Sequence, residues 1–205
     1  MLWNKAIPAE QKIKEIEEGI EPEAIETIRD PVEIQKISHA LIKSAKKEIL
    51  IIFSTANAFY RQDKAGTAGL LRQTAAVSNP KIKIRILMPL DEITKEEIVQ
   101  KISSEKVQQQ EQNQLVVNDV AVRHIEPSMQ TRVTALIIDR KYSLTVELKD
   151  DSKDNSYEAI GLATYSNSKP TVLTYTSIFE SLWMQTESSI FESLHRNTLE
   201  NLALS

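Results

Sequence analysis

The sequence predicts an α/β fold in which a mixed central β-sheet is flanked by helices and the chain ends in a long helix. Three observations lead to this prediction. Helical and strand patterns alternate over residues 31–89, an order that places parallel strands in one layer. Strand patterns then dominate residues 114–167. A long helical pattern follows from Lys169 and Pro170.

The first elements are short. Residues 9–20 carry the spacing of a short helix, and residues 23–30 alternate in the manner of a strand. Asp30 before Pro31 is typical of a helix N-cap followed by the first helical position. Apolar residues then recur on one helical face to about Lys47. We therefore expect a helix, a strand and a second helix in this order.

The run EILIIFS at 48–54 is too apolar for a half-exposed strand, so it predicts a central strand that is buried on both faces. A further helix at 68–77 and a further strand at 81–89 come next. Residues 94–114 are polar and helical at first, and we expect them to be exposed. The later strands, separated by turns and by a surface loop, are expected at 114–119, 120–126, 132–139, 142–148 and 158–167.

Composition narrows the class of protein. The 205 residues carry a net charge of −4 with both signs mixed, whereas a nucleic-acid-binding protein usually has a basic face. There is no Cys, no apolar run is long enough for a membrane helix, and the N-terminus lacks a signal-peptide core. Neither Gly-rich nucleotide-binding motif occurs. We therefore expect a cytoplasmic protein that binds neither nucleic acid nor membranes.

The stretch RVTALIID at 132–139 has the spacing of the H-x-K-x-x-x-x-D signature of phospholipase D-type phosphodiesterases. Arg132 stands at the position of the His and Thr134 at that of the Lys. That chemistry needs His as nucleophile and acid, and Lys to hold phosphate oxygens. Thr can do neither, so we predict no catalytic residues. Asp139 remains, and an Asp at the end of a buried strand often hydrogen-bonds to a turn.

Residues 31–184 resemble a phospholipase D-like domain more widely. EIQKISHALIKSAKKEILIIFSTANAF is similar to its opening helix and strand. A narrower resemblance rests on VTALIIDRKYSLTVELKDDSK and AIGLATYSNSKPTVLTYTSIFESLWMQTE, which are similar to the N-terminal sensory region of cytosolic histidine kinases of archaea. The chain lacks the phosphoacceptor and ATP-binding motifs of those kinases. The resemblance therefore implies a non-catalytic sensory domain of a two-component histidine kinase whose catalytic core lies outside these residues.

This resemblance divides the chain into an N-terminal segment at 1–30, a sensory domain at 31–187 and a helical extension at 188–205 toward a signalling module. Two other functions stay open. One is the effector-binding domain of a TrmB-type transcription regulator, which uses a similar fold, and the other is weak phosphodiesterase activity. A regulator needs a winged-helix DNA-binding region, and residues 1–30 are too few and too acidic to form one.

The predicted partner is a small ligand or another protein of unknown identity. Polar residues that follow a buried strand are placed where open α/β sheets bind ligands, although ordinary turn formation and helix capping explain them as well. The Arg of the signature stretch can hold a carboxylate or phosphate, or it can pair with an acidic side chain or face solvent. The candidate ligand-binding residues are Ser54, Thr55, Asn57, Arg132, Thr134, Tyr165, Ser166 and Asn167.

No metal site or cofactor is predicted, because the three His residues lie on different elements. Assembly is predicted from the last helix, where apolar residues form a stripe: Ile178, Leu182, Ile190, Leu194 and Leu199, broadened by Phe179, Trp183 and Phe191. We expect the part up to Trp183 to pack on its own domain. Residues 190–204 have no obvious partner within the domain, so we predict a parallel two-fold homodimer through this helix.

Overall fold

A computed structural model of the chain describes residues 9–18, 23–77, 81–89, 114–117, 120–125 and 131–203. Residues 94–113 of the segment predicted to be exposed, 94–114, lie outside them. The helices are α1 (Ala9–Glu18), α2 (Pro31–Ser44), α3 (Ala56–Lys64), α4 (Thr67–Val77), α6 (Ser156–Ala159) and α7 (Lys169–Ala203). The strands are β1 (Ile25–Ile28), β2 (Glu48–Ile52), β3 (Lys83–Met88), β4 (Gln114–Val117), β5 (Val120–His124), β6 (Val133–Ile138), β7 (Tyr142–Leu148) and β8 (Ile160–Ser166).

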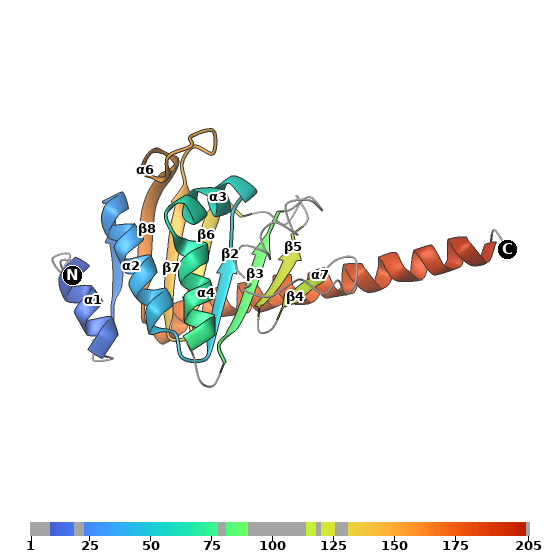
Figure 1. Cartoon of the computed structure of the whole chain (residues 1–205), viewed down its shortest axis with the longest axis horizontal. Helices are drawn as coiled ribbons and strands as arrows, with labels where there is room; N and C mark the ends of the chain where they lie inside the picture. The colour runs from blue at the N-terminus through green and yellow to red at the C-terminus, as the bar shows by residue number, and fades with distance from the viewer. Residues whose placement is uncertain are drawn as a thin grey trace.

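The described strands form one eight-stranded mixed sheet in the order β1-β8-β7-β6-β2-β3-β5-β4. The pairs β2–β3 and β3–β5 are parallel, and the other neighbours are antiparallel. In Figure 1, α2, α3 and α4 lie in front of the sheet and α7 crosses behind it. This confirms the predicted α/β class. Because β1 pairs with β8, residues 25–28 of the predicted N-terminal segment belong to the sheet.

Strand β2 is buried on both faces, as its continuous apolar run predicts. Ile49 and Ile51 face the core beneath α2 and α4. Leu50 and Ile52 face the second core, which α7 covers. The side chains of one strand therefore belong alternately to two separate hydrophobic layers.

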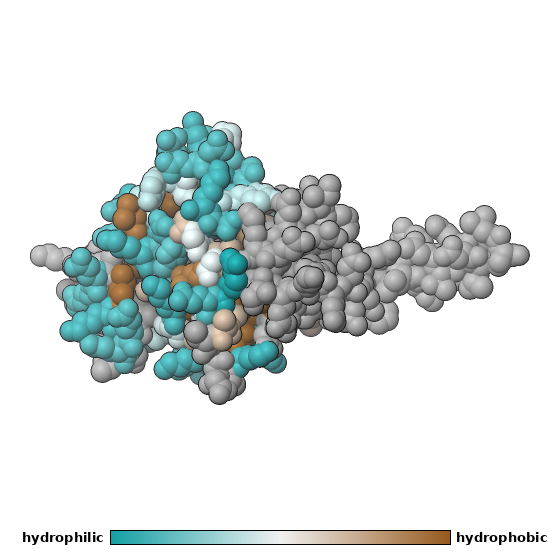
Figure 2. Space-filling view, viewed as in Figure 1, coloured by the Kyte–Doolittle hydropathy of each residue, from teal (hydrophilic) through white to brown (hydrophobic). Residues whose placement is uncertain are grey.

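Helix α2 begins as predicted. The Asp30 side chain accepts a hydrogen bond from the Val32 backbone N–H at 2.9 Å, and Pro31 occupies the first helical position. The buried side chains of α2 include Ile34, Ile37 and Leu41. Figure 2 shows the other side of this helix layer, which is mainly hydrophilic.

Helix α3 was not predicted, because its residues, ANAFYRQDK, are mostly polar. None of the described helices has an apolar stretch long enough to span a membrane.

The last helix is continuous from Lys169 to Ala203, as predicted, and Figure 1 shows it extending past the sheet. Its first half packs on the domain. The buried face runs through Val172, Phe179 and Trp183, whereas Ile178 of the predicted stripe is 41% exposed. The buried face therefore lies on the side of the predicted stripe that Phe179 and Trp183 broaden, and Leu182 of the stripe is partly buried against the same core. The side chains of residues 187–203 lie outside the description.

Ion pairs attach α7 to the sheet. Arg85 on β3 donates to both carboxylate oxygens of Glu180, at 2.9 Å and 2.7 Å. Its guanidinium also lies over the rings of Phe179 and Trp183, 5.2 Å and 5.4 Å from their centroids. Arg140 in the β6–β7 turn makes a second pair with Glu180. Hydrogen bonds from Arg85 hold the pKa of the Glu180 carboxyl below its ordinary value of 4.5.

We predict that Glu180→Gln lowers the free energy of unfolding by about 1 kcal/mol at pH 7. Because the pKa of Glu180 is depressed in the folded chain, its contribution is present above pH 4.5 and is lost as the pH falls through the lower folded-state pKa. Urea unfolding of both proteins from pH 7 to pH 3 measures this, with the exposed Glu158→Gln as control. A difference that is as large at pH 3 as at pH 7 would contradict the prediction.

Candidate functional site

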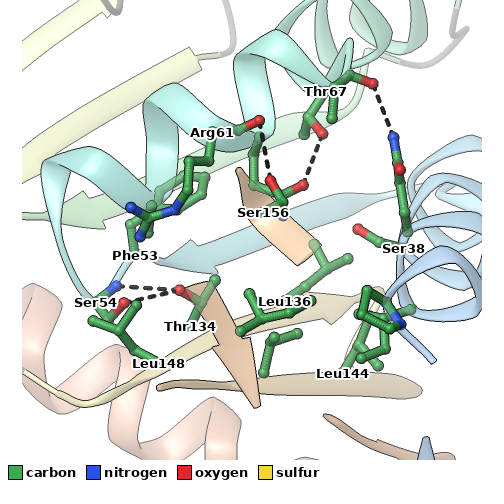
Figure 3. A pocket seen from close by; sticks show the side chains of 18 of the residues that line it. Ser38, Phe53, Ser54, Arg61, Thr67, Thr134, Leu136, Leu144, Leu148 and Ser156 are labelled. Carbon is green, nitrogen blue, oxygen red and sulfur yellow. Dashed lines mark hydrogen bonds between the residues drawn. The ribbon is translucent and has the colours of Figure 1, made fainter. Parts of the chain in front are cut away.

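A pocket opens between α2, α3 and α6 on one side and strands β2, β6 and β7 on the other (Figure 3). It lies at the end of β2 that leads into α3, where an open α/β sheet ordinarily presents a ligand site. The space open to the centre of a water molecule is about 60 Å³, which corresponds to a few waters. Most lining side chains are apolar, among them Ile34, Phe53 and Leu136.

One end of the pocket carries two hydroxyl groups. Thr134 on β6 and Ser54, which follows β2, both line it. Their side-chain oxygens lie 3.2 Å apart, and the Ser54 backbone N–H donates to the Thr134 hydroxyl at 3.3 Å. Thr134 stands at the position that holds Lys in the phospholipase D signature. At this point the pocket therefore presents hydroxyl groups in place of a cation.

Arg61 on α3 is a buried cation beside these hydroxyls, with 5% of its surface exposed. It donates to the Asp151 carboxylate at 2.6 Å. A second nitrogen donates to the backbone carbonyls of Asp151 and Lys153, both at 3.1 Å. Arg61 thus joins α3 to the loop between β7 and α6, and its charge is matched by a carboxylate from that loop.

Thr55 and Asn57 contact the same carboxylate. The Thr55 hydroxyl donates to Asp151 at 2.8 Å, and the Asn57 amide donates at 3.2 Å. Thr55 also caps α3 by accepting from the Ala58 backbone N–H at 3.0 Å. The three candidate residues after β2 therefore have two different roles. Ser54 lines the pocket, whereas Thr55 and Asn57 bind Asp151 in the loop between β7 and α6.

Helix α2 adds two polar residues, Ser38 and Gln35, to its otherwise apolar side of the pocket. Figure 3 shows the Ser38 hydroxyl pointing toward the cavity, and it has no hydrogen-bond partner among the described residues. The Gln35 amide donates to the Ala65 carbonyl at 3.3 Å and accepts from the Tyr157 hydroxyl at 3.3 Å. Behind this wall, burial lowers the pKa of His39 from 6.5, so its ring is neutral at neutral pH.

The structure does not bring the remaining candidates to the pocket. Arg132 precedes β6, is exposed and makes no side-chain hydrogen bond or ion pair with the described residues. Ser166 ends β8, six residues or roughly 20 Å of strand from Ile160 in the pocket wall.

Local packing accounts for the three residues at the end of β8. Tyr165 is buried and stacks on Tyr142, with ring centroids 6.5 Å apart. The Ser166 hydroxyl accepts from the Ser168 backbone N–H at 3.0 Å. Asn167 accepts from the Ala24 backbone N–H at 2.6 Å. These contacts join the end of β8 to α7 and to the start of β1.

Asp139 supports the backbone. Its carboxylate accepts from the backbone N–H groups of Lys46, Lys47 and Glu48, at 2.8 Å, 2.7 Å and 2.9 Å. The structural interpretation of Asp139 is therefore confirmed, although the segment it binds leads into β2 and does not follow β6. Among the described residues, no group of three or more His, Cys, Asp or Glu is arranged to hold a metal ion.

Sequence reasoning missed Arg61 and Ser38, which line the pocket, and Asp151, which pairs with Arg61 beside it. A Thr directly after a buried strand was the one available signal for α3, because Thr is a favoured N-cap. Nothing in the sequence pairs Arg61 with Asp151, 90 residues away.

No protein-family model matches this chain, and no curated protein matches it. Solved structures do resemble it. Nuc from Salmonella typhimurium, a phospholipase D family member, has a TM-score of 0.53 at 10% identity, over 80% of this chain and 96% of that chain. NucT from Helicobacter pylori has a TM-score of 0.51 at 14% identity, over 80% of this chain and 98% of that chain.

A third structure is TrmBL2, described as an archaeal chromatin protein with a novel mode of DNA binding. Its TM-score is 0.48 at 12% identity over 86% of this chain, and the match spans only 59% of the length of TrmBL2. The likeness to Nuc and NucT defines the class of this domain, a mixed α/β domain with a phospholipase D-like fold. At such low identity it defines the fold and not the activity.

We predict no phosphodiesterase turnover. Among the described residues that line the pocket, none is His or Lys, so the nucleophile and the acid are missing there, and the cation that does line it, Arg61, already pairs with Asp151. Incubation with bis(p-nitrophenyl) phosphate should release no more nitrophenol than buffer does. Turnover above buffer that falls in Thr134→Ala would contradict the prediction and assign the activity to this pocket.

Proposed function

We propose that this domain is a non-catalytic sensory module that binds a small ligand in the pocket and passes the change to α7. One observation carries this proposal. The pocket and α7 lie against opposite faces of the same two strands, β2 and β6. A ligand that favours one arrangement of these strands over another would shift the population of α7 positions.

The coupling would run through alternating side chains. Ile51 on β2 and Leu136 on β6 line the pocket. Their neighbours Ile52 and Ala135 belong to the core that α7 covers, beside Phe179 and Trp183. Only one layer of backbone separates the two sets. Because protein interiors are densely packed, a displacement on one face is felt on the other.

The proposed place of the module is the N-terminal part of a two-component histidine kinase of archaeal type in the cytoplasm. Its support is the sequence resemblance through VTALIIDRKYSLTVELKDDSK and the helix that follows. The full reading frame tests this proposal. A kinase core encoded downstream would support it, whereas a winged-helix region encoded upstream would favour a TrmB-type regulator.

We predict that Ser38→Leu abolishes ligand binding while keeping the fold, because the larger side chain would fill the pocket from α2. A thermal-shift screen of small metabolites on the wild-type chain identifies stabilising compounds, which are then tested on the variant. Lys36→Leu, at an exposed position of the same helix, is the matched control. A compound that stabilises wild type and Ser38→Leu equally binds elsewhere, and the proposed pocket would then be wrong.

Whether ligand binding changes the packing of α7 can be measured in the same experiment by Trp183 fluorescence. Trp183 lies in the core between the sheet and α7, so its fluorescence reports on that side of β2 and β6. A Trp3→Phe background leaves Trp183 as the single Trp of the chain. A compound that binds in the pocket should change this emission. Binding without any change at Trp183 would contradict the transmission step.

Assembly remains a prediction, namely a parallel two-fold homodimer through α7. Its support is the apolar residues of the sequence after Glu187, among them Ile190, Leu194 and Leu199. Light scattering across a concentration series should show a mass rising toward twice 23.2 kDa. A chain that stops at Glu187 should stay closer to the monomer. Equal masses for both chains at every concentration would contradict the prediction.

A further inference from the structure

We infer that the pocket selects a small uncharged ligand and discriminates against anions. This inference rests on the proposed function, since it names the class of ligand for the same pocket. It runs against what the fold alone suggests, because phospholipase D chemistry handles a phosphodiester. The argument comes from the charges that line the pocket, from the partners those charges already have, and from the groups left to meet a ligand.

Of the described lining residues, only Arg61 and Glu147 are charged. The Arg61 guanidinium gives one nitrogen to the Asp151 carboxylate and another to two backbone carbonyls. Glu147 is exposed on β7, where water screens its negative charge, so it compensates little for the burial of a cationic ligand. The pocket therefore offers an incoming anion no cation whose charge is unmatched.

An anion would have to displace Asp151 or stay unpaired. Displacement would take Arg61, Thr55 and Asn57 away from a carboxylate that all three already contact. It would leave the Asp151 charge without those donors. An unpaired anion among apolar side chains costs several kcal/mol, which small ligands do not recover from contact area. Both routes make an anionic ligand weaker than a neutral one of the same shape.

Hydroxyl groups and apolar walls are left to contact the ligand. Ser38, Ser54 and Thr134 each carry an oxygen that can donate or accept, so they suit a carbonyl, an amide or an alcohol. Apolar side chains make up most of the remaining lining. The small volume limits the enclosed part to a few heavy atoms, or to one end of a longer molecule.

Three probes of nearly equal shape and different charge test this inference at pH 7. They are isobutyramide, which is neutral, isobutyrate, which is anionic, and isobutylamine, which is cationic. Titrations of the 15N-labelled full chain are followed by the backbone amide signals of Ser54, Thr134 and Ser38. Isobutyramide should give saturable shifts with an affinity at least about tenfold higher than that of either charged probe.

A variant that removes the Asp151 charge tests whether this residue sets the preference. Asp151→Asn keeps an acceptor oxygen but removes the charge that matches Arg61, so isobutyrate should gain at least about tenfold in affinity. Asp150→Asn is the matched control, because Asp150 accepts from Ser152 and has no described contact with Arg61. Isobutyrate should bind Asp150→Asn as weakly as it binds wild type.

Several outcomes would overturn the inference. Isobutyrate or isobutylamine binding wild type as tightly as isobutyramide would show that the pocket does not select by charge. Saturable shifts from none of the three probes would overturn it too. If Asp151→Asn gained no more than Asp150→Asn, Asp151 would not be the counter-ion that sets the preference. The proposed function fails separately, when a bound compound leaves Trp183 unchanged or binds Ser38→Leu equally well.

Discussion

Each strand of the β2–β6 pair buries side chains on both of its faces, so neither strand can move without displacing two layers. Their register places Ile51 opposite Leu136 on the pocket side and Ile52 opposite Ala135 on the α7 side. Asp139 stabilises one end of this pair. Its backbone N–H donates to the Glu48 carbonyl at 3.0 Å, and its carboxylate binds the N–H groups that lead into β2. The position of the pocket relative to α7 follows from this pairing.

The elements that the sequence predicts well are those whose causes are local. Burial of β2 follows from its unbroken apolar run, and the start of α2 follows from Asp30 and Pro31. The length of α7 follows from a helical pattern with no Pro after Pro170. Strand order could not be predicted, because the pairing of β6 with β2 and of β8 with β1 joins segments more than 80 residues apart.

The two arginines, Arg132 and Arg61, also show that contacts between distant segments could not be predicted from the sequence. Sequence reasoning singled out Arg132 as a candidate, because a charged residue beside an apolar strand is unusual, and left open that it faces solvent at the start of the strand. That residue precedes the strand, so its side chain reaches solvent without cost. Arg61 is the buried one, and its partner Asp151 lies in a loop of turn-forming residues. Burial of a guanidinium depends on a carboxylate being close in space, and spacing along one element carries no information about that.

The three residues of this chain at the positions of the phospholipase D signature differ in their roles. At the two positions that would perform chemistry, this chain has an exposed Arg132 and a hydroxyl, Thr134, that is bonded to Ser54. At the third it has Asp139, whose carboxylate binds three backbone N–H groups and so contributes to folding in the absence of any reaction. The pocket of this fold therefore has only Arg61, which pairs with Asp151, and Glu147 as charged residues among the described lining. The fold places the pocket on one face of the β2–β6 pair and the long helix α7 on the other.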